Sequence, residues 1–245
     1  MRDRSHASMT QTNWDLIRDA ASGSETARAS LDAVMKRAWP AVYAFIRASG
    51  RKSEEATELT QAFICDVFLA RRLLEKADQA RGRFRTLLLG AVRNYLADVH
   101  RRRTATTRMP KSGLIAIDAA GEYGMDVADD ATGDSPERAF NARYVAGLVR
   151  TAGERLHREL QADGDAAGWE LFRARVLQAA FQGDAPGYDT LAPRLGLERG
   201  QCAAKLLVVK RRFSVLLMEE LRATVSDPDA VREEVDDLLA LLKAR

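Results

Sequence analysis

A helical repeat of apolar residues from Phe84 to Val99 is the sequence feature that most limits how this chain can fold. At about 3.6 residues per turn these side chains fall on one side of a helix, so another part of the chain must cover them. The other side is polar, and the repeat runs into three consecutive arginines at 101–103. The sequence therefore predicts a long helix with one buried face and one basic face. The expected buried positions are Phe84, Leu87, Leu88, Ala91, Val92, Tyr95, Leu96 and Val99.

The charge of this helix is segregated from that of the rest of the chain. Residues 81–103 hold seven arginines and one aspartate, whereas residues 118–137 hold seven acids and no base. The 245 residues together carry a formal charge of only +3, so a nucleic-acid role would depend on such local segregation. Arginine matches phosphate oxygens, asparagine can bond to a base edge and an aromatic ring can stack on an unpaired base. A solvated basic face without a ligand is the alternative. The expected exposed positions are Thr86, Arg93, Asn94, Ala97 and Arg101.

Composition limits the class of protein. A content of 46% hydrophobic and 30% charged residues is typical of a soluble, mostly helical chain. No apolar run approaches the roughly 20 residues that cross a bilayer, and the N-terminus lacks the apolar centre of a secretion signal. We therefore expect a cytoplasmic protein that does not enter a membrane.

The sequence contains no pattern of residues that indicates a catalytic site. His6, His100 and His157 are scattered, and no glycine-rich phosphate loop is present. Cys65 and Cys202 have no partners at metal-ligand spacing and are expected to be small buried hydrophobic residues. We expect no catalysis, no cofactor and no small-molecule substrate.

The order of periodic and irregular segments predicts an all-α chain with two helical domains joined by an acidic, flexible linker. The expected parts are an N-terminal tail with a short helix at 1–24, a first bundle at 25–104, a linker at 105–135, a second domain at 136–222 and a C-terminal helix at 223–245. We expect the C-terminal helix to pack on the second domain.

Local signals predict several helix boundaries. Pro40 is expected to kink or split the helix that contains it, because proline removes a helical hydrogen bond. Ser53 is expected to cap the next helix, and Ser135, followed by proline, to cap the first helix of the second domain. Further helices are expected at 136–151, 153–162 and 166–182.

Residues 188–213 have the pattern of a helix-turn-helix. A short helix ends at Leu195, Gly196 permits a sharp turn, Leu197 fills the corner and a longer helix begins near Glu198. In the longer helix Cys202, Leu206, Val209 and Phe213 are expected to face inward. The exposed ridge would hold Gln201, Lys205, Val208 and Arg212, with Arg199, Lys210 and Arg211 beside it.

Two features of this segment differ from those of a helix-turn-helix that reads DNA bases specifically. Pro193 falls late in the first helix, and Ala203, Ala204, Leu207 and Val208 stand where a base reader would carry polar side chains. Phosphate contact is therefore expected more than base-specific readout. A helical hairpin without DNA contact is the alternative.

Six segments, taken together in this order, resemble bacterial sigma factors of the extracytoplasmic-function type, in a branch common in planctomycetes. Each segment is weak alone, but their order and spacing are specific, and they cover most of residues 14–222. The segments are Trp39–Arg47, Glu58–Phe63, Arg81–Leu88, Arg93–Asp98, Ser135–Glu137 and the helix-turn-helix at Tyr188–Phe213.

The resemblance implies a sigma region 2 and a sigma region 4, with core RNA polymerase and promoter DNA as partners. An anti-sigma factor is a further partner that such proteins can have. The acidic linker would thread toward the polymerase active-site channel. The implied polymerase-binding residues are Glu58, Leu59, Thr60, Gln61 and Phe63, with Glu58 in place of the usual aspartate and Ala62 in place of the usual acid.

The resemblance also implies two sets of DNA contacts. The helix at 84–103 would open the downstream promoter element and hold a flipped base, and the helix-turn-helix would hold the upstream element. The implied region 2 contacts are Arg85, Thr86, Arg93, Asn94, Arg101, Arg102 and Arg103, and the implied region 4 contacts are Arg199, Gln201, Lys205, Lys210, Arg211 and Arg212.

Two rival interpretations remain open at this point. One is a transcription regulator that binds polymerase and DNA but does not initiate by itself. The other is a helical interaction protein with an incidental basic face.

Overall fold

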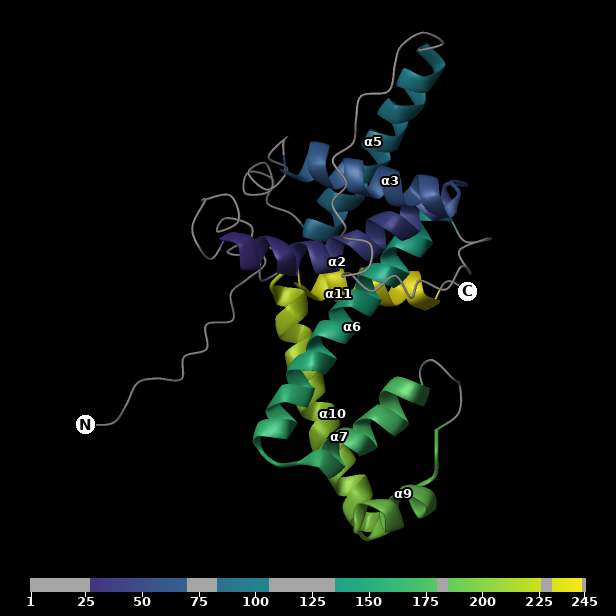
Figure 1. Ribbon diagram of the computed structural model, residues 1–245. Coiled ribbons are helices and arrows are strands. Elements are labelled where there is room, and N and C mark those ends of the chain that lie inside the picture. The colour runs from purple at the N-terminus through teal and green to yellow at the C-terminus, as the bar shows by residue number, and fades with distance from the viewer. Residues whose placement is uncertain (1–26, 70–82, 106–134, 180–184, 226–230, 244–245) are drawn as a thin grey trace, which may run out of the picture. The chain divides into compact units, whose positions relative to one another are not determined.

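The computed structural model describes residues 27–69, 83–105, 135–179, 185–225 and 231–243 (Figure 1). The chain divides into two compact units, each described here by itself. Of the described residues, those up to Gly147 and from Leu221 onward belong to the first unit. Leu148 to Glu220 form the second unit. The long helices α6 (Pro136–Ala162) and α10 (Arg199–Arg222) each contribute residues to both units.

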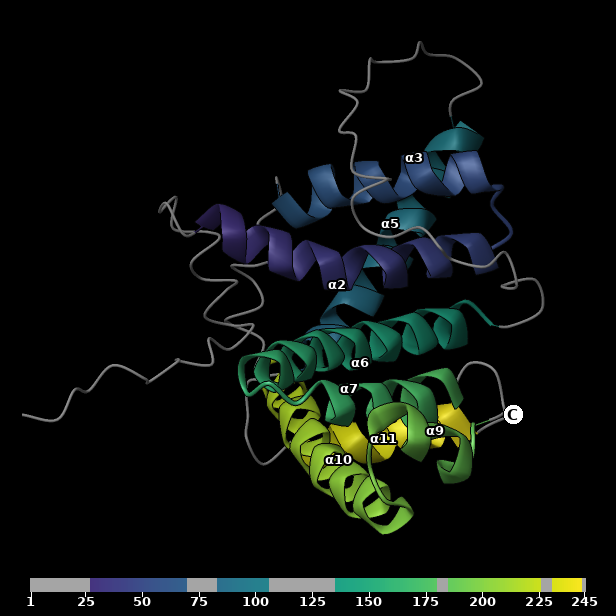
Figure 2. The same cartoon turned by 60° about the horizontal axis from the view of Figure 1, so that its bottom comes forward.

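The first unit is built around α2 (Ala27–Ala48), which packs on α3 (Ser53–Phe63) and on α5 (Phe84–Ala105). Figure 2 shows α2 and α3 lying side by side. A short π-helical segment, η1 (Ile64–Leu69), continues α3. The largest fully buried side chains of this unit are Trp39, Ile46, Phe63, Phe84, Leu88 and Phe140.

The C-terminal helix α11 (Val231–Lys243) belongs to the first unit. Arg83 and Arg85, at the start of α5, form ion pairs with Glu233, Glu234 and Asp237 of α11. The backbone amide of Phe84 also donates a hydrogen bond of 3.0 Å to the carbonyl of Thr224. The expectation that this helix packs on the second domain is therefore wrong. Its attachment depends on charged residues, which apolar periodicity does not register.

The second unit contains the C-terminal part of α6, then α7 (Ala166–Phe172), the π-helical segment η2 (Arg173–Leu177), α9 (Tyr188–Leu195) and α10. Its core gathers apolar residues of all these helices. Within it the ring of Phe172 lies 4.8 Å from that of Phe213. The buried members are Ala152, Leu156, Leu171, Phe172, Ala174, Leu191, Ala192, Cys202, Leu206, Val209 and Leu216.

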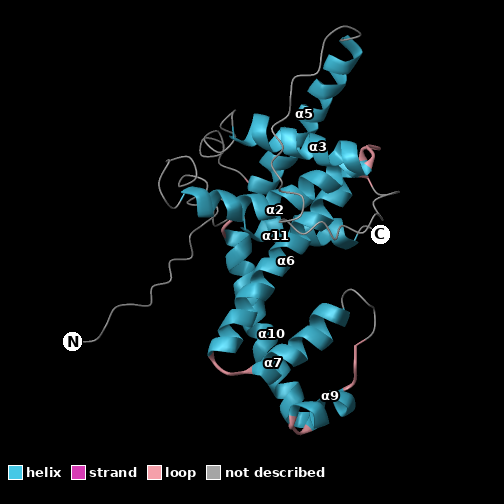
Figure 3. Ribbon diagram, in the orientation of Figure 1, coloured by secondary structure: helices cyan, strands magenta, loops and turns pink. Residues whose placement is uncertain are grey.

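Helices form nearly all of the described chain, so the all-α class is confirmed (Figure 3). An isolated bridge pairs Arg83 with Val225. No described helix combines the length and the hydropathy that crossing a bilayer requires.

Several helix boundaries differ from those expected. The helix α2 runs through Pro40 as one element, so Pro40 does not split it into two helices. Ser53 is the first residue of α3 and bonds to the Tyr43 hydroxyl at 2.9 Å, and no side chain caps this helix. The two helices expected at 136–151 and 153–162 are one helix, α6. The Ser135 cap is confirmed, because its hydroxyl accepts a hydrogen bond of 3.2 Å from the amide of Arg138.

The two cysteines differ in burial. Cys202 is fully buried, as expected, but Cys65 is only half-buried. Partial burial and the neighbouring Asp66 raise the pKa of the Cys65 thiol. Neither residue forms a disulfide.

Some expectations concern residues outside the described ranges. These are the N-terminal tail with its short helix at 1–24, the last residues of the helix expected at 166–182 and nearly all of the acidic linker at 105–135.

Candidate nucleic-acid interfaces

The two faces of α5 are divided as the sequence predicts. Phe84, Leu88 and Val92 are buried, and the other expected core positions are half-buried. The ring of Tyr95 packs edge-on against Phe63 of α3, with ring centres 5.5 Å apart. The exposed residues of the opposite face include Thr86, Arg93, Asn94, Ala97, Arg101, Arg102 and Arg103.

Arg85 does not belong to this exposed face. Its side chain is 7% exposed and donates to Glu234 through Nε at 2.6 Å and Nη2 at 2.9 Å, while its Nη1 donates to Asn141 at 2.8 Å. Glu234 itself is completely buried. A guanidinium group held in this way cannot turn to a phosphate without removing both of its hydrogen bonds from a buried carboxylate. The assignment of Arg85 as a DNA contact is therefore corrected to a structural role.

Arg93 is also paired, but at the surface. Its Nη2 lies 2.8 Å from Glu137 Oε1, with side chains 57% and 40% exposed. The pKa of Glu137 is lowered by a hydrogen bond from its own backbone amide and by the bond from Arg93. An exposed pair contributes only about 0–1 kcal/mol, so Arg93 can exchange its carboxylate for a phosphate at little cost.

Two arginines at the end of α5 also form exposed surface pairs. Arg101 bonds to Asp98 one turn earlier, and Arg103 bonds to Glu55 of α3. Their side chains are 75% and 55% exposed, so these cations also face solvent. The pair of Arg103 with Glu55 therefore joins the basic end of α5 to α3, and both surface pairs are weak and exchangeable.

The α3 residues implied as polymerase contacts divide into two groups. Leu59, Thr60 and Phe63 are buried, and the Thr60 hydroxyl donates to the carbonyl of Ala56 at 2.7 Å. Thr60 therefore lies in the core with Phe63, three residues later on the same helix, and cannot serve as a surface contact. Glu58 is exposed and Gln61 is half-buried, so these two side chains are the ones that reach the surface.

In the second unit, the turn between α9 and α10 has the expected form. Gly196 ends α9 with φ +64°, a left-handed conformation that glycine adopts without steric cost. The amide of Leu197 donates to the carbonyl of Ala192 at 3.1 Å, and the Leu197 side chain packs against the core. Cys202, Leu206 and Val209 are buried, as expected for the inward side of α10.

Three polar residues expected on the exposed ridge of α10 are held by bonds within the unit. Lys205 Nζ lies 2.8 Å from Asp165 Oδ1, and Arg212 binds both carboxylate oxygens of Glu159 at 2.7 Å. Gln201 Oε1 accepts a hydrogen bond of 2.8 Å from the amide of Glu198. These partners come from distant α6 and α7 residues or from the helix's own first turn, so the α10 sequence alone gave no signal of them.

These bonds change the acidity of the carboxylates. The hydrogen bond from Arg212 lowers the pKa of Glu159. Partial burial acts to raise the pKa of Asp165, but the hydrogen bonds from Lys205 and the Gly168 amide outweigh it and the pKa is lowered. Both carboxylates therefore keep their charge well into the acidic range.

The cations that remain on α10 lie on a different side. Lys210 and Arg211 are exposed, and neither has an ion-pair partner among the described residues. Arg199 is 71% exposed and lies 3.3 Å from Asp189 of α9. Within the helix-turn-helix segment at 188–213, the unpaired positive charge of α10 is thus at Lys210 and Arg211 rather than along the Lys205 and Arg212 edge.

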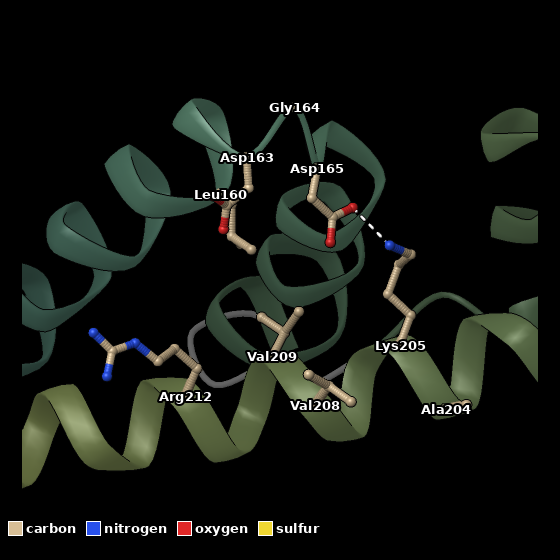
Figure 4. Close-up of a pocket in the computed structure, with 9 residues that line it drawn as sticks. All are labelled: Leu160, Asp163, Gly164, Asp165, Ala204, Lys205, Val208, Val209 and Arg212. Atoms are coloured by element: carbon tan, nitrogen blue, oxygen red, sulfur yellow. Dashed lines mark hydrogen bonds and ion pairs between the residues drawn. The ribbon is translucent and has the colours of Figure 1, made fainter. Parts of the chain in front are cut away.

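A groove separates the α6–α7 turn from α10 (Figure 4). Figure 4 shows Lys205 reaching across it to Asp165, with Val208 and Val209 on the α10 side. Of its charged lining residues, Lys205 pairs with Asp165, and Arg212 pairs with Glu159 outside the groove. The lining residues are Leu160, Asp163, Gly164, Asp165, Ala204, Lys205, Val208, Val209 and Arg212.

Comparison with known proteins identifies no relative. No protein-family model, no curated protein and no solved structure matches the chain. Its function must therefore be argued from the two surfaces described above.

Proposed function

We propose that this chain is a sigma factor that binds core RNA polymerase, recognises promoter DNA and promotes strand opening. The proposal joins the order of the sequence segments to two separate basic surfaces, one on α5 and one on α10. No chemistry by the chain itself is required, since polymerase performs the catalysis.

The observation that carries the proposal is the exposed polar face of α5, backed by a buried apolar core. Arg93 and Asn94 lie side by side on this face, and Arg101 follows two turns later. Guanidinium groups suit phosphates, and the Asn94 amide suits a base edge. Unstacking one base costs a few kcal/mol, which phosphate neutralisation and contacts to the extruded base can offset. Such a face supports strand opening without a nucleotide cofactor.

The polymerase contact rests on a smaller surface than the sequence suggested. With Leu59, Thr60 and Phe63 in the core, the contact on α3 would use Glu58 and Gln61. Reversing the Glu58 charge with Glu58→Arg should weaken binding to core polymerase. Glu54→Arg is the matched control, because Glu54 is an exposed acid at the start of the same helix. Equal effects of the two substitutions would contradict this assignment.

The decisive experiment is transcription in vitro with purified bacterial core polymerase and a genomic promoter library. The proposal predicts promoter-dependent transcripts that need this chain. The double variant Arg93→Ala with Asn94→Ala should abolish open complexes, measured by permanganate reactivity of unpaired thymines, and should leave polymerase binding intact. Arg158→Ala, which removes an exposed arginine of α6, is the matched control. Loss of polymerase binding in the double variant would show that the faces of α5 are misassigned.

The same experiment separates the rivals. A regulator that does not initiate would bind polymerase without yielding transcripts. A helical interaction protein would neither bind polymerase nor support transcription.

A further inference from the structure

The outward face of α10 carries exposed apolar side chains beside its cations. Among the described residues, the large hydrophobic side chains that are exposed are Leu207, Val208 and Val215, at 51%, 64% and 48%, and all three lie on this helix. Ala203 and Ala204 are exposed beside them. The core of the unit is already filled by the opposite face, so these residues are not needed for folding. Their concentration on one helix indicates a ligand with apolar groups.

The first turns of α10 can approach a ligand closely. Gly200, Ala203 and Ala204 are exposed and project little beyond the backbone, and the space around a Cβ at Gly200 is open. From Ala203 to Val208 the helix rises about 7.5 Å, which matches about two base-pair steps. A helix with this profile can lie deep in a major groove with Leu207 and Val208 against the base edges.

Hydrogen-bonded base readout has few groups to use here. Gln201 is bonded to the amide of Glu198, and Lys205 is bonded to Asp165. The major groove offers one apolar group for recognition, the C5 methyl group of thymine, and small apolar side chains contact it. Lys210 and Arg211, which have no ion-pair partner among the described residues, are available for the flanking phosphates.

We propose that α10 recognises thymine methyl groups in the major groove of duplex DNA, through Ala204, Leu207 and Val208. This inference rests on the proposed function and adds the chemical identity of the upstream element, a thymine-rich sequence of about two or three base pairs. It also accounts for the exposed apolar side chains in the middle of α10, since methyl groups are recognised without hydrogen bonds.

Charge favours DNA over a partner protein as the occupant of this face. Residues 199–218 hold five cations and no acid; Arg199, Lys205 and Arg212 pair with acids of the unit, which leaves Lys210 and Arg211, among the described residues, unpaired beside the apolar side chains. Arg211 lies within the apolar stripe, between Leu207 and Val215, where a covering protein helix would bury it. A burial of that kind is costly unless the partner supplies a carboxylate at that position, whereas the phosphates of a duplex lie on both sides of the groove.

The test compares two 20-base-pair duplexes, alternating dA·dT and the same duplex with every thymine replaced by uracil. The two differ only in the methyl group, and alternating sequence presents it in every register, so the promoter sequence need not be known. Affinity is measured by fluorescence anisotropy at one stated salt concentration, for the full chain alone and bound to core polymerase. We expect binding to the uracil duplex to be weaker by about fourfold for each methyl group buried.

Two variants give the expected signature. Leu207→Ser with Val208→Ser should bind both duplexes equally, at the level of the wild-type chain on the uracil duplex. Lys210→Ala with Arg211→Ala should weaken binding to both duplexes by the same factor and lower the salt dependence, since phosphate contacts carry no sequence information. Circular dichroism would confirm that both variants fold.

Three outcomes would overturn the inference. Equal affinity of the wild-type chain for both duplexes would mean phosphate contact alone. An unchanged thymine preference in the serine variant would place methyl recognition elsewhere. No binding to either duplex, or no effect of either double variant, would assign the apolar face to a partner protein. None of these depends on transcription, so promoter-dependent transcripts would still support the proposed function, and their absence would refute that function separately.

Discussion

Replacing Glu234 with glutamine should destabilise the first unit strongly, although the substitution changes almost no volume. The carboxylate is completely buried and accepts two hydrogen bonds from Arg85, and one of its oxygens lies 3.3 Å from Arg83 Nη1. Burial acts to lower the pKa of Arg83, but the hydrogen bond with Asp237 and the charges of Glu234 and Asp237 raise it. Glutamine would keep one acceptor and would leave the buried Arg85 with only Asp237, 3.9 Å from its Nη2, as a compensating charge.

The expected loss follows from the burial of both partners. Removing one member of a buried ion pair typically costs about 3–5 kcal/mol. Glutamine can still accept one bond from Arg85, so we expect a value near the lower end, about 3 kcal/mol. For a chain of this size that corresponds to a fall of roughly 6–12 °C in the melting temperature.

The assay is urea unfolding followed by the fluorescence of Trp39, which is buried in the first unit. The other two tryptophans, Trp14 and Trp169, are first replaced by phenylalanine so that Trp39 alone reports. Glu233→Gln is the matched control, because Glu233 also pairs with Arg83 but is 73% exposed. Its loss should stay below about 1 kcal/mol.

Two results would refute the reasoning. One is a Glu234→Gln variant whose midpoint and slope match those of Glu233→Gln. The other concerns Arg85→Met combined with Glu234→Met, in which no charge remains to be compensated. This double variant should recover most of the stability lost in Glu234→Gln, because apolar pairs often replace buried ion pairs without loss. A double variant less stable than Glu234→Gln would contradict the electrostatic account.

Three further predictions concern the helix ends and the second unit. Gly196→Ala should lower the free energy of unfolding by about 1–2 kcal/mol in thermal unfolding, because φ is +64° at this position. Gly200→Ala, within α10, should leave the stability unchanged or raise it slightly. Equal effects of the two substitutions would mean that the left-handed turn is not a constraint. Ser135→Ala should cost about 1 kcal/mol through loss of the α6 cap, and Ser135→Asn, which restores an acceptor, should recover it. The pKa values of Glu159 and Asp165 are lowered in the folded state, so their contribution is full above the unfolded values near pH 4 and is lost as pH falls through the lowered values. The free energy of unfolding, measured by thermal denaturation from pH 6 to pH 2.5, should fall less for Glu159→Gln with Asp165→Asn than for wild type. The difference should be about 1 kcal/mol or less, because both groups are partly exposed. An identical fall in the two proteins would contradict the pKa assignment.

Apolar periodicity correctly predicted the helix faces whose burial depends on apolar residues alone. The two faces of α5 and the inward side of α10 follow their 3.6-residue repeats, and Gly196 and Leu197 marked the turn because few other residues fit there. The continuity of α6 was missed, because Gly153 reads as a break. A single glycine costs a helix only about 1 kcal/mol, which packing on both sides of it offsets.

The contact between α11 and α5 could have been predicted from charged residues that interrupt an apolar stripe, which a count of apolar positions does not consider. Glu234 lies at the spacing of Val231 and Leu238, in the middle of an apolar stripe. Arg85 lies in the same way at the spacing of Leu88 and Val92. Two stripes that are each interrupted by one residue of opposite charge predict a mutual pair. The surface pairs of Lys205 and Arg212 left no such signal, because an exposed cation can pair with any nearby acid.

The pairing of Arg85 with Glu234 joins residues 149 positions apart. During translation the nascent chain exposes the start of α5 long before the ribosome has made α11, and all of the second unit is synthesised in between. Closing the early helices over an arginine without its counter-ion is costly, so that side of the bundle stays open to water while elongation continues. The portion of the protein made first is therefore the portion that matures last, and premature termination before α11 yields a product in which Arg83 and Arg85 lack their acidic partners.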